Sequence, residues 1–260
     1  MHLLRTSILI LGAILIALIG SYFYSLNCGG PDWLKDTSLN VGTEVLGIFL
    51  TVWLIDAVIR RKEQSERERV IKVAFSQLRL PLRRHIEMLV AMYKGALAHA
   101  PQPPPRDLTE LFGPEYAVQV AYLDFAKPAP LMNVLPLNWF DYFHHEIEKF
   151  SSALSRTIEK YATFLDPETV EILEELLAST LLSFLSQTRA IPPIHKQQGI
   201  DRRYNLLAGQ GVSELIRQHT TLVEQLVEIA NQKLPQDKTL GLNAQDWRND
   251  IAPQFGSARL

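Results

Sequence analysis

Two apolar stretches near the N-terminus constrain the fold of this chain more than any other feature. The first, residues 6–24, reads TSILILGAILIALIGSYFY and contains no charge. The second, residues 41–59, reads VGTEVLGIFLTVWLIDAVI. A helix needs about 20 mostly apolar residues to cross the hydrocarbon core of a bilayer. Residues 1–59 are therefore predicted to form a two-helix transmembrane hairpin, with an outer loop at residues 25–40.

The main alternative interpretation of the first stretch is a cleaved signal peptide. Such a peptide also begins with a basic residue, here Arg5, and has an apolar centre. No small-x-small cleavage site precedes Tyr22, Phe23 and Tyr24, and aromatic rings are typical of the membrane interface. These features favour a retained membrane helix.

The distribution of positive charge predicts the orientation of the hairpin. Arg60, Arg61 and Lys62 follow the second stretch directly, whereas residues 25–40 contain only Lys35. Cytoplasmic flanks of membrane helices carry the excess of lysine and arginine. We therefore expect a multi-pass protein of the plasma (inner) membrane, with the loop outside and both termini in the cytoplasm.

The second stretch contains two acidic residues, Glu44 and Asp56. Intramembrane acids often mark proton or ion sites. Both acids lie near the ends of the stretch, where burial in lipid costs less. Glu44 falls in the first helical turn, and Asp56 is four residues before Arg60, the spacing of an ion pair. Capping and pairing are therefore the favoured interpretation.

Each stretch also carries small residues at every fourth position. Such faces let membrane helices approach closely. The two faces are predicted either to meet within the hairpin or to form the seam of a homo-oligomer. They consist of Ala13, Ala17 and Ser21 in the first stretch and Thr43, Gly47 and Thr51 in the second.

Composition limits the remaining possibilities. The 260 residues leave about 200 outside the hairpin, enough for one domain with its own core. The net charge of −2 argues against a nucleic-acid-binding protein. One cysteine, Cys28, excludes an internal disulfide and a cysteine zinc site. It lies in the predicted outer loop, as a spare thiol or as a link between two copies.

The segment after the hairpin predicts a stalk and then a connector. Residues 60–98 form a charged helix with an apolar stripe, which suggests a juxtamembrane stalk or a short coiled coil. Pro81 should kink this helix or mark a boundary. Residues 99–136 are a proline-rich connector with a weak helix that is cut at Gly113–Pro114. The stripe consists of Phe75, Leu78, Leu82, Ile86, Leu89 and Tyr93.

Residues 137–234 predict a cytoplasmic antiparallel helical bundle. One helix begins after the N-cap Asn138, and the next begins at Pro167 and ends at the break Ile191–Pro193. A last helix stops before Pro235. Residues 235–260 are predicted to be a mobile tail, of which Trp247 docks one short piece. No strand pattern appears, so the predicted fold class is all-α.

The strongest metal candidate in the sequence is the set Asp141, His144 and Glu148, which shares one helix face. A carboxylate-bridged di-iron site would need a second Glu-x-x-His, which the sequence lacks. His219 lies on an apolar stripe and is predicted to be a hydrogen-bonded core residue. No nucleotide-binding, hydrolase or kinase motif is present, so neither a cofactor nor an enzymatic activity is predicted.

The second stretch and its exit carry a recognisable pattern. It reads roughly Glu-Leu-x-Gly-Ile-x-x-Thr-Val-x-x-Ile-Asp followed by basic residues, and it covers Glu44 to Lys62. The element resembles one found in uncharacterised bacterial membrane proteins that have an N-terminal two-helix hairpin and a cytoplasmic helical region. Val45 and Ala57 depart from the commoner residues. The resemblance implies a bacterial plasma membrane and no particular activity.

These features together predict a membrane-anchored interaction or scaffold protein. Its expected partners are the lipid bilayer, an unknown cytoplasmic protein and further copies of itself. The alternative is a sensor or an oligomeric transporter-like assembly in which Glu44 and Asp56 act within the membrane.

Overall fold

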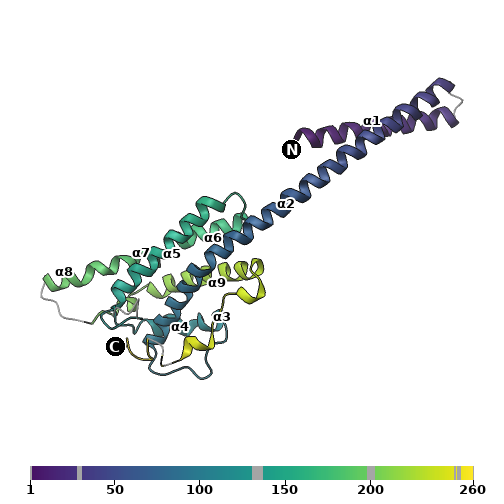
Figure 1. The fold of residues 1–260 in the computed structure, drawn as a ribbon. Coiled ribbons are helices and arrows are strands. Elements are labelled where there is room, and N and C mark those ends of the chain that lie inside the picture. Colours follow the sequence, from purple (N-terminus) through teal and green to yellow (C-terminus); the bar gives the residue numbers. More distant parts are fainter. Residues whose placement is uncertain are drawn as a thin grey trace. The chain divides into compact units, whose positions relative to one another are not determined.

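The computed structural model describes residues 2–27, 31–130, 137–197, 203–248, 250 and 253–259. Nearly all regular structure in these residues is helical. Strand-like pairing is confined, within these residues, to isolated bridges of Leu123 with Arg259 and of Pro128 with Asn138. The predicted all-α class is confirmed. The chain divides into an N-terminal unit, Met1–Glu68, and a C-terminal unit, Arg69–Leu260 (Figure 1).

The N-terminal unit contains helix α1, His2–Asn27, and the beginning of helix α2, Asp32–Ala96. Both helices are long and apolar enough to cross a membrane. The predicted outer loop at residues 25–40 was too long, because α1 continues to Asn27 and α2 begins directly after Pro31. Polar residues that lack glycine and proline can extend a helix beyond the apolar thickness of a bilayer.

Helix α2 also corrects the prediction of a stalk over residues 60–98. Arg60 to Arg69 are exposed, but from Ile71 the helix enters the core of the C-terminal unit. The predicted apolar stripe is buried along its whole length, and Met88 to Met92 are buried on every side. Pro81 lies inside the helix, which continues to Ala96. Burial of Leu78 and Leu82 around it offsets the backbone hydrogen bond that proline removes.

The predicted connector also belongs to this core. Helix α3, Leu108–Leu111, begins at Asp107, whose carboxylate accepts a hydrogen bond from the Glu110 amide. Helix α4, Pro114–Val120, follows, so the predicted interruption at Gly113–Pro114 is confirmed. The large apolar side chains of this segment are buried, and the Tyr116 hydroxyl donates to the Leu89 carbonyl of α2 at 2.9 Å. The buried side chains are Leu108, Leu111, Tyr116, Val120, Leu123 and Phe125.

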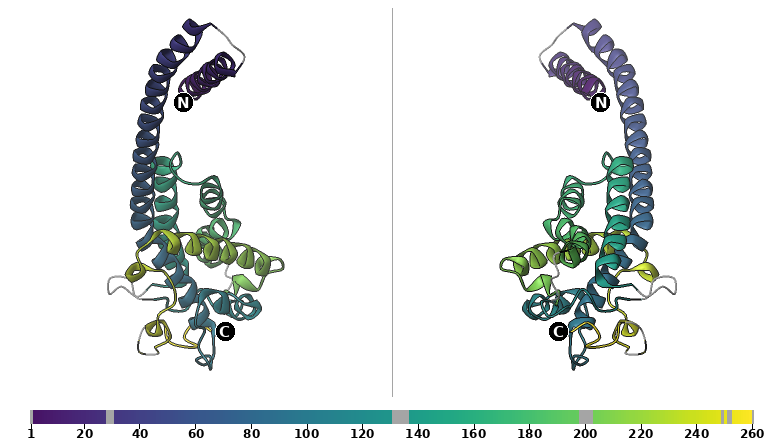
Figure 2. Two further views of the ribbon diagram at one scale, coloured as in Figure 1. Left: turned by 90° about the vertical axis from the view of Figure 1, so that its right-hand side faces the viewer. Right: turned by 90° about the vertical axis from the view of Figure 1, so that its left-hand side faces the viewer.

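Helix α5, Trp139–Tyr161, lies beside the second half of α2, as Figure 2 shows. Asn138 caps it by accepting a hydrogen bond from the Asp141 amide at 3.0 Å, as predicted. Helix α6, Pro167–Leu177, packs against α5 and against α9, Val212–Lys233. Gly211, with φ of 82°, precedes α9 in a conformation that glycine adopts without strain.

Two helix ends differ from the prediction. The single helix expected from Pro167 to Ile191 is divided, because Ser179 leaves helical geometry and α7, Thr180–Gln187, starts anew. The prolines at 192 and 193 do not end a helix. After the turn η1, Thr188–Ala190, they lie in the first turn of α8, Ile191–Gln197, where their missing amide hydrogens need no partner.

The predicted mobile tail is packed against the C-terminal unit. The Ala258 amide donates to the Gly95 carbonyl at 3.1 Å, and Ala258 is completely buried. Asn231 of α9 bonds the backbone of Leu240 through both its amide nitrogen and its carbonyl oxygen. Trp247 docks edge-on to Tyr93, as predicted. The short turns of this region are η2, Leu206–Ala208, η3, Gln236–Lys238, and η4, Ala244–Trp247.

Candidate functional site

Three buried side chains from different parts of the C-terminal unit form one hydrogen-bond chain. Nδ1 of His219 lies 2.9 Å from Oγ of Ser179, and Nε2 of His219 lies 2.7 Å from Nε2 of His85. Both imidazoles are 1% exposed and Ser179 is 9% exposed. At the other end of the chain, the ring of Phe150 stacks on the face of His85 at a centroid distance of 3.9 Å.

Local structure explains how these side chains meet. The inner face of α9 carries Ile216, His219 and Val223 at helical spacing, so His219 points into the core. Ser179 occupies the break between α6 and α7. Its hydroxyl does not cap α7 and instead contacts His219. The interpretation of His219 as a hydrogen-bonded core residue is confirmed.

Burial keeps both imidazoles neutral at pH 7. It lowers the pKa of His219 to about 4. It lowers the pKa of His85 well below its ordinary value, and the neighbouring His219 lowers it further. A neutral imidazole has one nitrogen that donates and one that accepts. The two rings therefore share one proton between their Nε2 atoms.

The chain has two possible proton arrangements. In the outward arrangement, His85 donates to His219, His219 donates to Ser179, and Nδ1 of His85 is a bare lone pair. In the inward arrangement, Ser179 donates to His219, His219 donates to His85, and Nδ1 of His85 carries a proton. Nδ1 of His85 is buried and lacks a partner among the described residues. The outward arrangement is favoured, because a buried acceptor without a partner is tolerated better than a buried donor.

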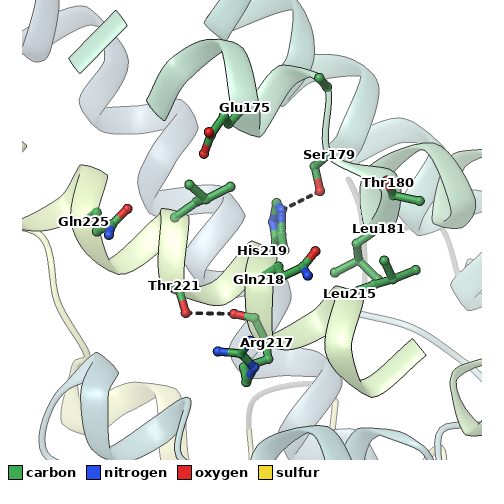
Figure 3. A pocket seen from close by; sticks show the side chains of 12 residues that line it. Glu175, Ser179, Thr180, Leu181, Leu215, Arg217, Gln218, His219, Thr221 and Gln225 are labelled. Carbon is green, nitrogen blue, oxygen red and sulfur yellow. Dashed lines mark hydrogen bonds between the residues drawn. The ribbon is translucent and has the colours of Figure 1, made fainter. Parts of the chain in front are cut away.

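Ser179 and His219 lie on the wall of a cavity of about 560 Å³ that α6, α7 and α9 line (Figure 3). Figure 3 shows His219 directed toward Ser179, with Glu175 nearby. The outward arrangement leaves the hydroxyl proton of Ser179 free for an acceptor. The wall can therefore offer a hydrogen bond whose direction depends on a second histidine behind it.

Sequence reasoning identified one member of this chain and missed two. His85 follows the apolar stripe of α2 at the position before Ile86, where it resembles a surface residue. Ser179 lies within a continuous helical pattern that gives no sign of the break. The available signal was the polar residue His85 beside the buried stripe of α2. Its role becomes visible only with its partner His219 on α9.

The predicted metal candidates do not assemble into a ligand set. Nε of Arg189 lies 3.0 Å from Asp141 Oδ1. His144 is half-buried and Glu148 is exposed. Within the part of the chain that the structure describes, no three histidine, cysteine, aspartate or glutamate residues are grouped to hold a metal ion.

The two small-residue faces do not meet in the N-terminal unit. Thr43, Gly47 and Thr51 are exposed, and a Cβ on Gly47 would have no neighbour within 4 Å. Ala13 and Ala17 are also exposed, and Ser21 is half-buried. The helices approach elsewhere, since a Cβ on Gly12 would lie 4.0 Å from Phe49. The structure therefore does not show the first predicted alternative, in which the two faces meet within the hairpin. The second alternative, a homo-oligomer seam, stays a prediction.

The charged residues of the second stretch follow the expected pattern at one position. Nη2 of Arg60 lies 2.5 Å from Oδ2 of Asp56, which confirms the predicted pair. The prediction that Glu44 lies in the first helical turn is wrong, because α2 begins at Asp32 and Glu44 is an exposed residue inside it. Arg61 and Lys62 are exposed beyond the pair. Cys28 lies outside the described residues.

Comparison with known proteins found no matching family model, no matching curated protein and no matching solved structure. The resemblance of the Glu44–Lys62 element to bacterial membrane proteins stays a prediction.

Proposed function

We propose that this chain is a membrane-anchored helical interaction protein. Helix α1 and the first part of α2 form a hairpin in the plasma (inner) membrane, and the C-terminal unit is a cytoplasmic bundle that binds a protein partner. The observation that carries the proposal is the change of character along α2. Its large apolar side chains are mostly exposed up to Ile59 and mostly buried from Ile71 onward, where Val73 and Leu80 are the exposed exceptions.

The exposed apolar residues support the membrane assignment. Monomeric soluble proteins rarely expose long apolar surfaces, and lipid is the solvent that such a surface requires. The residues stand on all sides of α2, so a protein partner on one face would not cover them. They include Leu46, Ile48, Leu50, Trp53, Leu54, Ile55, Val58 and Ile59.

The positive charges that follow α2's apolar segment support a cytoplasmic C-terminal unit. Arg60, Arg61 and Lys62 are exposed, and Asp56 pairs with Arg60 at the same level. Lysine and arginine are retained on the cytoplasmic side of membrane helices. Pairing at the interface also removes the cost of placing Asp56 in lipid.

The single cysteine provides a direct test of this topology. A membrane-impermeant maleimide should label Cys28 in intact cells, because the proposal places residue 28 outside. A matched variant with Cys28→Ser and Ser152→Cys moves the thiol to an exposed position on α5. That thiol should be labelled only after the membrane is permeabilised. Labelling of the matched variant in intact cells would contradict the proposed topology.

The scaffold and sensor hypotheses differ in what they require of the membrane acids. In the scaffold hypothesis Asp56 only pairs with Arg60, and Glu44 is an exposed acid inside α2. Asp56→Asn and Glu44→Gln should therefore leave the cross-linked cytoplasmic partners unchanged. Membrane fractionation verifies insertion of each variant. Loss of a partner from an inserted variant would favour the sensor or transporter-like alternative.

A further inference from the structure

A second cavity lies between α2 and α5, on the His85 side of the hydrogen-bond chain. Its volume is about 290 Å³, and we refer to it as the basic cavity. Arg84 and His85 line it from α2, and Glu146, Lys149, Phe150 and Arg156 line it from α5. The volume suits one small ionic group rather than an extended ligand.

Positive charge dominates the walls of the basic cavity. Nζ of Lys149 lies 3.4 Å from Oε1 of Glu146, so this pair is close to neutral. Arg84 and Arg156 contribute two further positive charges from opposite walls. Nε of Arg156 donates to the Ser152 carbonyl at 3.1 Å, which anchors the guanidinium to its own helix. The residual charge of +2 matches a phosphate group, which carries −1.5 to −2 near pH 7.

His85, one of the residues that line this cavity, has an uncommitted polar atom. Only 1% of His85 is exposed, and its Nδ1 has no partner among the described residues. A buried polar atom without a partner costs free energy unless a ligand, water or ion satisfies it. A group in the basic cavity that accepts a hydrogen bond would remove this cost.

We propose that the basic cavity binds a phosphate group, with Arg84 and Arg156 pairing with its oxygens and Nδ1 of His85 donating to it. Guanidinium groups match phosphate geometry through paired N–H donors. Donation by Nδ1 requires the inward proton arrangement. Binding therefore turns the hydroxyl of Ser179 from a donor into an acceptor on the wall of the other cavity.

Titration of inorganic phosphate into the full-length protein in phosphatidylcholine nanodiscs tests the site by calorimetry. The proposal predicts saturable binding that Arg84→Gln and Arg156→Gln each weaken about tenfold, since each removes one charge-assisted contact. Both arginines are exposed, so neither substitution disturbs the core. Arg217→Gln is the matched control, because Arg217 is exposed, pairs with Glu214 and lines the other cavity.

A second measurement reports on His85 itself. In ¹⁵N-histidine-labelled protein, phosphate should move the His85 proton to Nδ1, and two-bond nitrogen–proton correlations distinguish the two tautomers. A shift of proton position at His85 with phosphate supports the proposal. Binding of phosphate without any change at the His85 nitrogens would overturn the assigned role of this residue.

The source of the phosphate group is decided by a parallel series with phosphatidic acid in the nanodiscs. If inorganic phosphate moves the His85 proton and this shift requires Arg84 and Arg156, the ligand is free phosphate. If only phosphatidic acid produces the same shift, the ligand is a lipid headgroup. Equal binding of acetate would overturn the assignment to phosphate. Absence of binding in both series, or binding that Arg84→Gln and Arg156→Gln do not weaken, would overturn the site.

Discussion

His219 and His85 couple the stability of the C-terminal unit to pH. Above about pH 6.5, histidines are neutral in both the folded and the unfolded chain. Below this pH the unfolded chain takes up protons that the folded chain, with a pKa of about 4 for His219, does not. Stability is therefore complete above about pH 6.5 and falls toward about pH 4, by roughly 3 kcal/mol for His219 alone.

Replacement of His219 should remove much of this pH dependence. In thermal unfolding of the full-length protein, wild type should lose more stability than His219→Gln between about pH 7.5 and about pH 5. The glutamine variant should be less stable at the higher pH, because it loses the fit to Ser179 and His85. His145→Gln, at an exposed position of α5, is the control and should retain the wild-type slope. An unchanged slope in His219→Gln would contradict the neutral buried pair.

At the scale of elements, helical spacing identified faces but not their partners. The stripe of α2 from Phe75 to Tyr93 was predicted correctly, yet it covers the core of a domain and does not form a stalk. Periodicity records that a face is apolar and says nothing of what lies against it. The break at Ser179 was missed for a related reason, since α6 and α7 continue the same apolar spacing across it.

The exposed face Thr43–Gly47–Thr51 carries the prediction that belongs to this scale. The hydroxyls of Thr43 and Thr51 bond backbone carbonyls of their own helix, which leaves a smooth surface for close helix approach. If this face forms a homo-oligomer seam, Gly47→Val should lower the association constant between copies about tenfold. Energy transfer between labelled copies in membranes measures this constant.

Gly20→Val of α1 is the matched control for this experiment, because Gly20 is also exposed and a Cβ there would meet nothing within 4 Å. Both variants should insert normally. Equal energy transfer in wild type and Gly47→Val would exclude this face as the seam.

At the scale of the whole chain, the C-terminal segment is bound to α2 by charged and backbone contacts. Nη2 of Arg83 lies 3.0 Å from Oδ1 of Asp246, and both side chains are mostly buried. Arg83 also donates to the Gly241 carbonyl, and the Lys94 ammonium donates to the Arg248 carbonyl. These contacts join residues more than 150 positions apart. They convert a polar segment into part of the domain.

Loss of the Arg83–Asp246 pair should release this segment. We expect Arg83→Gln to cost about 1 kcal/mol and to accelerate cleavage at Lys238 by a lysine-specific protease several-fold. Asp246→Asn should have a smaller effect, because Arg83 keeps its hydrogen bond to the Gly241 carbonyl. The double variant should add little to Arg83→Gln, because the two residues share one interaction. The control, Arg248→Gln, breaks only an exposed pair with Asp250 and should leave cleavage unchanged. Equal cleavage in Arg83→Gln and wild type would show that the pair does not hold the segment.

The sequence alone determined the all-α class, the two apolar helices, the Asp56–Arg60 pair, the starts of α5 and α6 and the buried state of His219. Each of these depends on residues within a few positions of one another, where spacing, caps and prolines act directly. The tertiary structure decided what distant residues do together. It placed His85, Ser179 and His219 in one chain, set Arg84 opposite Arg156, and packed the C-terminal segment on α2. Contacts between separate helices depend on how several apolar faces pack into one core. The spacing of residues within one helix does not determine which faces pack together.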